Sequence, residues 1–242
     1  MEAFWSHWIW PFLTAVTGFV FTYLLLKQYV ERRKPHQLAW AGGMFLYAAA
    51  AVIEAYSEYS QGWNPLVYRF YYVMAAVLVL YLGLGTVYLM FKKRIWGHIY
   101  LAYTLILTAF FLYASLTADL VTANLVPGIT VGGTAMDTTV RLFSFACTIP
   151  GTLALLGGAI LSVIKFAAKK EYAYRMWANV LIAAGTISIA TAGALARRGE
   201  AVGLYPAEML GAALLLWGFL KAGSLKQGAE QTTPKGRELA GS

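Results

Sequence analysis

Four ionisable side chains interrupt long apolar stretches of this sequence. They are Glu54 in AVIEAYSEY, Arg69 in PLVYRFYYV, Arg141 in TTVRLFSFA and Glu208 in YPAEMLGAA. A charge within a membrane-spanning helix costs several kcal/mol unless it is paired or faces water. Two carboxylates and two guanidinium groups should therefore point inward, where they either pair with one another or bind a polar molecule.

The two arginines define the chemistry that we expect of such a site. Two guanidinium groups can hold a carboxylate or a phosphate through paired hydrogen bonds. We therefore predict that Arg69 and Arg141 bind an anion and that Glu54 and Glu208 orient them. Tyr72 lies three residues after Arg69 on the same helix face, so we predict that it lines the site and donates a hydrogen bond.

Three interpretations of this charge set remain open. The charges could form ion pairs that only hold four helices together. They could bind a small polar or anionic ligand, including an amphiphile, in a pocket that faces outward. Glu54 could also act as a general base in an intramembrane enzyme that acts on a lipid headgroup. We favour binding, by a sensor-like module or a carrier, over catalysis.

Three kinds of binding partner are also expected. We expect membrane lipids, the small ligand and a cytoplasmic or membrane partner protein. No cofactor, nucleic acid or metal ion is expected. The three histidines, His7, His36 and His98, fall at helix ends on opposite sides of the membrane, so they cannot share a metal or haem site.

Seven apolar stretches must position these side chains. The chain has 242 residues and only 12% of them are charged, against about 25% in a soluble domain. Each stretch meets or approaches the roughly 20 residues that a helix needs to cross a bilayer. The stretches are 8–30, 38–59, 65–91, 95–117, 138–166, 173–196 and 205–222. We predict an all-α integral membrane protein, a seven-transmembrane-helix bundle over residues 1–225, followed by a disordered tail over 226–242.

Basic residues are concentrated on one side of this predicted bundle. The loops after the first, third and fifth stretches, together with the tail, hold 15 of the 19 Lys and Arg residues. Because cytoplasmic loops are enriched in these residues, we place the N-terminus outside and the C-terminus in the cytoplasm of a plasma-membrane protein. The same loops account for the net charge of +8.

The string NPLVY contains the N-P-x-x-Y pattern of G-protein-coupled receptors. In those receptors the pattern lies near the end of the seventh helix, whereas here it begins the third. At that position Asn64 can cap the helix, and Pro65 is tolerated in the first turn. Microbial rhodopsins need a lysine midway along the seventh helix, and Lys221 lies at its end instead. The chain therefore departs from both families.

Two other resemblances concern the layout of the helices. GWNP at 62–65 parallels GLYP at 203–206, which suggests two parallel three-helix halves joined by one helix. This 3+1+3 layout resembles SWEET and PQ-loop transporters, although the P-Q dipeptide is absent. The segment IEAYSEYSQGWNPLVYRFYYV resembles the seven-helix input regions of bacterial sensor kinases, in which an acidic end of the second helix precedes arginine and aromatic residues.

Two segments could contribute moving parts. In the outer loop 118–137, the runs ANLV and ITV flank Pro127-Gly128 and predict either a small hairpin lid or an irregular loop. Pro150 predicts a kink midway along the fifth helix, where Thr148 could bond a freed backbone carbonyl. In a transporter such a kink would serve as a hinge.

Overall fold

A computed structural model of the chain describes residues 2–126, 133–167, 173–197 and 201–231. This part of the chain contains seven α-helices and one short 3-10 helix, η1. They are α1 (Glu2–Arg32), α2 (Pro35–Tyr59), α3 (Pro65–Met90), α4 (Arg94–Thr117), η1 (Thr122–Asn124), α5 (Thr138–Ala167), α6 (Ala173–Arg197) and α7 (Ala201–Gln231). The predicted helical fold class is confirmed, and α3 to α6 begin and end within one residue of the predicted bounds.

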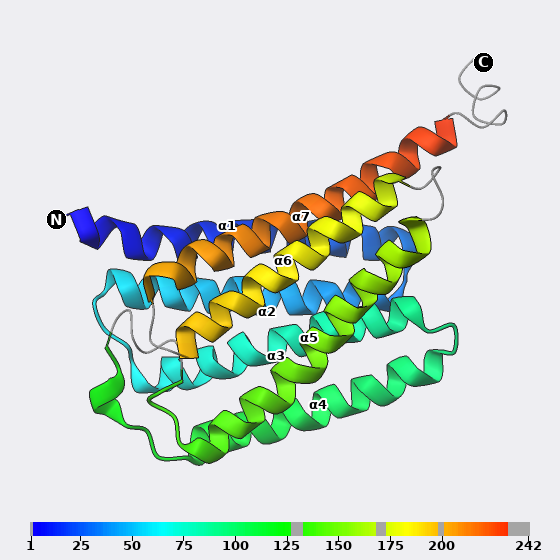
Figure 1. The fold of residues 1–242 in the computed structure, drawn as a ribbon. Coiled ribbons are helices and arrows are strands. Elements are labelled where there is room, and N and C mark those ends of the chain that lie inside the picture. The colour runs from blue at the N-terminus through cyan, green and yellow to red at the C-terminus, as the bar shows by residue number, and fades with distance from the viewer. Residues whose placement is uncertain (1, 127–132, 168–172, 198–200, 232–242) are drawn as a thin grey trace.

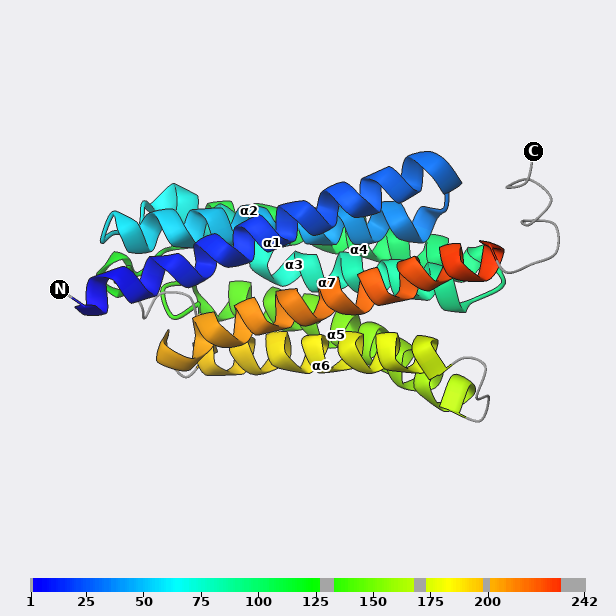
Figure 2. The same ribbon diagram turned by 90° about the horizontal axis from the view of Figure 1, so that it is seen from above.

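The helices lie side by side in an elongated bundle (Figure 1). In this view α1 and α7 run along one edge and α4 runs along the opposite edge, whereas Figure 2 shows α1, α7 and α6 in succession across the bundle. The described ends of α1 and α7 point to opposite ends of the molecule, as an odd number of crossings requires. Since α4 packs mainly against α3, it has the peripheral place that a 3+1+3 layout expects. The repeat itself stays a prediction.

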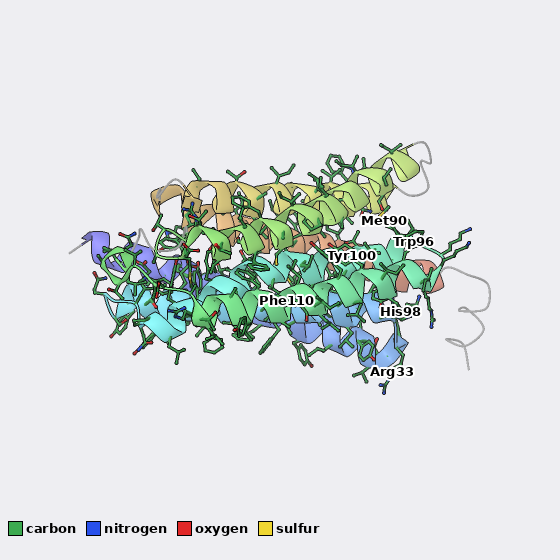
Figure 3. The ribbon with its side chains drawn as sticks, turned by 90° about the horizontal axis from the view of Figure 1, so that it is seen from below. Arg33, Met90, Trp96, His98, Tyr100 and Phe110 are labelled. Atoms are coloured by element: carbon green, nitrogen blue, oxygen red, sulfur yellow. The ribbon has the colours of Figure 1, made fainter. Side chains whose placement is uncertain are left out.

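Apolar side chains cover the outside of the bundle as well as its core. On α4, Phe110 and Tyr113 are 61% and 68% exposed, and Figure 3 shows Phe110 midway along that helix. Within the described part of the chain, six helices are long and apolar enough to cross a membrane, and α6 contains a shorter apolar stretch, Trp177–Gly193. An apolar exterior of this kind suits contact with lipid tails. The protein is therefore a multi-pass helical membrane bundle.

The turns after α1 and α3 lie at the same end of the bundle. Figure 3 shows Arg33, from the first of these turns, at the same end as Trp96 and His98, which follow the second. Both turns are rich in Lys and Arg. This is the clustering that the positive-inside interpretation requires, and the orientation of the bundle in the membrane stays a prediction.

The start of α3 illustrates how local sequence determines a helix end. The Asn64 side chain accepts hydrogen bonds from the backbone N–H groups of Leu66 and Val67, at 2.9 and 3.3 Å. Pro65 follows in the first turn, where its missing N–H has no consequence. The predicted cap is confirmed.

The last helix differs from the expectation at its end. α7 continues to Gln231 and so includes the first residues of the tail that we predicted to be disordered from residue 226. The segment KAGSLKQGAEQ consists mostly of residues that tolerate a helix, and the next proline in the chain is Pro234. Residues 232–242 lie outside the described part of the chain.

α3 and α5 approach so closely that their backbones are in contact. A Cβ atom added at Gly151 would lie 2.6 Å from the carbonyl carbon and oxygen of Val79. Gly83 faces Gly151 across the same contact, and a Cβ atom there would lie 2.9 Å from the Gly151 Cα. Small residues permit such close packing between membrane helices. This contact fixes where α5 crosses the centre of the bundle.

Pro150 deprives the carbonyl of Ala146 of its helical donor, because proline has no backbone N–H. The hydroxyl of Tyr103 on α4 replaces that donor and lies 2.8 Å from the Ala146 oxygen. Thr148, which we expected to fill this role, donates instead to the carbonyl of Ser144 at 3.0 Å. That expectation was wrong, because a neighbouring helix supplies the donor. α5 continues through Pro150, so the hinge stays a prediction.

The outer loop before α5 returns across the end of α3. Leu120 and Met136 form a single antiparallel bridge at the base of the loop. The run ANLV, one of the two predicted strands, overlaps η1 instead. The other run and Pro127-Gly128 lie outside the described residues. Within the described residues, antiparallel pairing is therefore present at the base of the loop and not at ANLV.

Candidate functional site

A cavity of about 480 Å³ lies between α2 and α3 on one side and α5, α6 and α7 on the other. Ligand pockets typically have volumes of about 300–1,000 Å³. The character of the lining changes along the bundle. Ionisable and tyrosine side chains gather toward the end where α2 stops and α7 begins, and aliphatic side chains line the deeper part. The principal polar residues of the lining are Tyr47, Glu54, Tyr71, Tyr72, Arg141, Ser144 and Glu208.

Two carboxyl groups meet at the polar end of the cavity. Glu54 is only 2% exposed, and its carboxyl group lies within hydrogen-bonding reach of the carboxyl group of Glu208. The Tyr71 hydroxyl donates to Glu54 Oε1 at 3.3 Å, and the Tyr47 hydroxyl donates to the backbone carbonyl of Glu208 at 2.9 Å. Because two carboxylates offer only acceptors, their contact is favourable when a proton or a cationic group lies between them.

Arg141 faces the same cavity from the first turn of α5. Asp137 caps this turn, since its Oδ2 accepts a hydrogen bond from the Thr139 N–H at 2.9 Å and its carbonyl accepts one from the Arg141 N–H at 3.1 Å. The bond from the Thr139 N–H lowers the pKa of the Asp137 carboxyl group. Asp137 is therefore ionised at neutral pH and holds the start of the helix that carries Arg141.

Tyr72 separates the cavity from the outer loop. The loop residue Gly133 has a φ of +80°, and a Cβ atom there would lie 2.5 Å from the Tyr72 ring. Backbone hydrogen bonds from Gly133 and Ala135 reach the hydroxyl of Tyr68, and Tyr68 stacks on Tyr72 with the ring centroids 6.1 Å apart. A glycine is required where the loop passes Tyr72. The loop thus covers the aromatic side chains at this end of α3.

Arg69, the second predicted anion ligand, lies outside the cavity. Its guanidinium group donates to the backbone carbonyl of Ser115 on α4, and the Ser115 hydroxyl donates to the Arg69 carbonyl at 3.2 Å. Arg69 therefore links α3 to α4, and the expected pair of arginines does not face one cavity. The structure does bring together the other four predicted ligand residues, Glu54, Tyr72, Arg141 and Glu208.

Sequence reasoning did not assign two buried tyrosine contacts beside these residues. One is the bond from Tyr71 to Glu54 described above. The other joins the Tyr205 hydroxyl to Glu58 Oε1 at 2.8 Å, where Glu58 is 3% exposed and Tyr205 is 2% exposed. The four-residue spacing of Glu54 and Glu58 does place both on one helix face. No sequence signal connects either of them to a tyrosine on another helix.

Comparison of the chain with protein families, with curated proteins and with solved structures found no match. The function is therefore inferred from the cavity and its chemistry.

Proposed function

We propose that this protein binds a small amphiphile in the cavity between α2, α3, α5, α6 and α7. The polar head group lies at the Glu54–Glu208 carboxyl pair, and the apolar tail lies along the deeper aliphatic wall. One observation carries this proposal: the carboxyl pair and the guanidinium group of Arg141 share the polar end of a cavity whose other end is lined by side chains such as Leu78 and Leu153.

An amine-bearing or zwitterionic head group matches these charges best. An ammonium group donates up to three hydrogen bonds, so it can satisfy Glu54 and Glu208 together. A negative group on the same head can face Arg141 and form charge-assisted hydrogen bonds with it. A head group with negative charge alone meets one guanidinium group and two carboxyl groups in this cavity, so it fits less well.

The protein acts in this proposal as a sensor-like module or a carrier in the plasma membrane, with the N-terminus outside. The concentration of 15 of the 19 Lys and Arg residues on one side supports this orientation. Glu54, Glu208 and Arg141 lie toward the opposite end, so the head group enters from the outside.

The test is a thermal-stability screen of the purified protein in lipid nanodiscs with four probes that share a decyl chain. The probes are decylamine, N-decylglycine, decyl phosphate and decyl maltoside. We expect decylamine and N-decylglycine to raise the Tm, because their ammonium groups can lie between the two carboxyl groups. Decyl phosphate and decyl maltoside serve as controls for the tail and are expected to leave the Tm unchanged.

Two matched variants locate the binding site. Glu54→Gln is expected to abolish the shift caused by decylamine, because it removes one carboxylate from the cavity. Glu58→Gln makes the same chemical change one helical turn away, at a residue that does not line the cavity, and should keep the shift. A shift of equal size in both variants, or stabilisation by decyl phosphate alone, contradicts the proposal.

The contact between two carboxyl groups also favours a second candidate, an intramembrane enzyme with Glu54 as a general base toward a lipid headgroup. Paired carboxyl groups that share a proton are suited to proton transfer. Mass spectrometry of lipids incubated with the protein separates the two candidates. A headgroup product that Glu54→Gln no longer forms supports the enzyme, and unchanged lipids support binding.

A further inference from the structure

A second, smaller cavity lies in the other half of the bundle. It has a volume of about 90 Å³ and is lined by residues from α1, α2, α3, α5, α6 and α7. Met90 is one of its lining residues, and Figure 3 shows Met90 toward the end that holds Arg33 and His98. Its lining is predominantly apolar and includes the polar residues Thr86, Ser162 and Asn179. The two cavities therefore occupy opposite halves of the same helix bundle.

The two cavities meet at two leucines. Leu82 on α3 and Leu155 on α5 line both of them, and they are only 6% and 8% exposed. Trp40 fixes the backbone at Leu82, because its indole N–H donates to the Leu82 carbonyl at 3.0 Å. A Cβ atom at Gly85 would lie 2.2 Å from the Trp40 ring, so the indole lies directly on α3.

We propose that the two cavities form one transport path through the bundle and that Leu82 and Leu155 are the gate between them. This inference rests on the proposed function and extends it from binding to transport of the bound amphiphile. Membrane carriers hold their substrate within the helix bundle and open it to one side at a time. The aliphatic gate blocks the charged head group in this conformation.

The sizes of the two cavities indicate which side of the proposed carrier is open to the ligand. A volume of about 90 Å³ holds only a few water molecules, at about 30 Å³ each, so the smaller cavity has no room for the amphiphile. The larger cavity, with Glu54 and Arg141, does have room. This conformation is therefore the one in which the ligand site faces the N-terminal side and the path to the other side is closed.

Cysteine accessibility tests the path without any ligand. The full chain carries one cysteine, Cys147, so Cys147→Ala gives a cysteine-free background. Ser144→Cys reports on the larger cavity and Ser162→Cys on the smaller one. A membrane-impermeant, positively charged methanethiosulfonate is applied to right-side-out and to inverted membrane vesicles. With the gate intact, we expect Ser144→Cys to react from the N-terminal side and Ser162→Cys to be protected from that side.

Opening the gate should remove this separation. In the Leu82→Ala/Leu155→Ala variant we expect Ser162→Cys to lose its protection and to react from the N-terminal side. The matched control is Leu66→Ala/Leu161→Ala, which makes the same changes on the same two helices at residues that are 56% and 55% exposed. Protection should persist in this control.

Two outcomes overturn the inference: continued protection of Ser162→Cys in a folded gate variant, and reaction of Ser162→Cys from the N-terminal side with the gate intact. If the double variant does not fold, Leu155→Ala alone must give partial loss of protection from the N-terminal side. Failure of the amphiphile screen would leave the labelling result unaffected. Conversely, if the screen shows binding but the labelling shows no path between the cavities, the protein is a sensor-like module and not a carrier.

Discussion

The carboxyl group of Glu54 on α2 lies within hydrogen-bonding reach of the carboxyl group of Glu208 on α7. The two residues are far apart in the sequence. A second contact joins the same two helices, because the Tyr47 hydroxyl donates to the Glu208 carbonyl at 2.9 Å. A contact between two acceptors is unfavourable without a donor between them. The protein keeps such a contact in a cavity, which is typical of a functional site.

The first prediction concerns the stability of Glu54→Gln. The new amide can donate a hydrogen bond to Glu208, so the free energy of unfolding should stay the same or rise by about 1 kcal/mol. Binding of decylamine should weaken at least about tenfold, or about 1.4 kcal/mol. Thermal unfolding and titration in nanodiscs measure the two effects. A large loss of stability would show that the carboxyl pair is a structural contact.

The second prediction separates the two arginines. Arg69→Ala removes a donor to the Ser115 carbonyl and should lower stability by about 1–3 kcal/mol, the usual cost of leaving a buried acceptor without its donor. Binding of N-decylglycine should not change. Arg141→Ala should show the opposite pattern, with weaker binding of N-decylglycine and little change in stability. Equal effects of the two variants on binding would contradict the separation that the structure shows.

The third prediction couples Pro150 to Tyr103. Tyr103→Phe removes the donor to the Ala146 carbonyl and should cost about 0.5–1.5 kcal/mol. In a Pro150→Ala background the helix regains its own N–H donor, so the same Tyr103→Phe change should cost much less. A double-mutant cycle of unfolding free energies measures this coupling. Tyr113→Phe, at a tyrosine of α4 that is 68% exposed, is the control and should be neutral in both backgrounds.

The fourth prediction concerns two glycines of α5. Gly151→Ala places a methyl group against the backbone of α3, where the nearest atoms of Val79 lie 2.6 Å away, so α3 and α5 must separate. We expect a loss of about 1–3 kcal/mol, as for other overpacked sites. Gly157→Ala is the matched control, because a Cβ atom there meets nothing within 4 Å. Since alanine favours the helix, Gly157→Ala should be neutral or stabilising by up to about 1 kcal/mol.

The helices were predictable because their signals are local. The length of each apolar run and caps such as Asn64-Pro65 determine where a helix lies, and α3 matches its prediction to within one residue. The partners of Arg69 and Ala146 were not predictable, because Ser115 and Tyr103 are more than 40 residues away in the chain. Spacing within a helix defines a shared face but not the helix that this face meets.

The same reason explains how much of the site was predictable. Glu54, Arg141 and Glu208 stood out because ionisable residues are rare in apolar runs, and all three line the cavity. Tyr71 gave no such signal, because the chain holds 16 tyrosines and only the packing of α2 against α3 selects this one.

The backbone contact between α3 and α5 at Gly151 has a mechanical consequence. It lies near the middle of α5, with Arg141 of the larger cavity before it and Ser162 of the smaller cavity after it. A rigid helix that tilts about a fixed central point moves its two ends in opposite directions. Tilting α5 about Gly151 would therefore narrow one cavity while it widens the other, which is the motion that the proposed transport path requires.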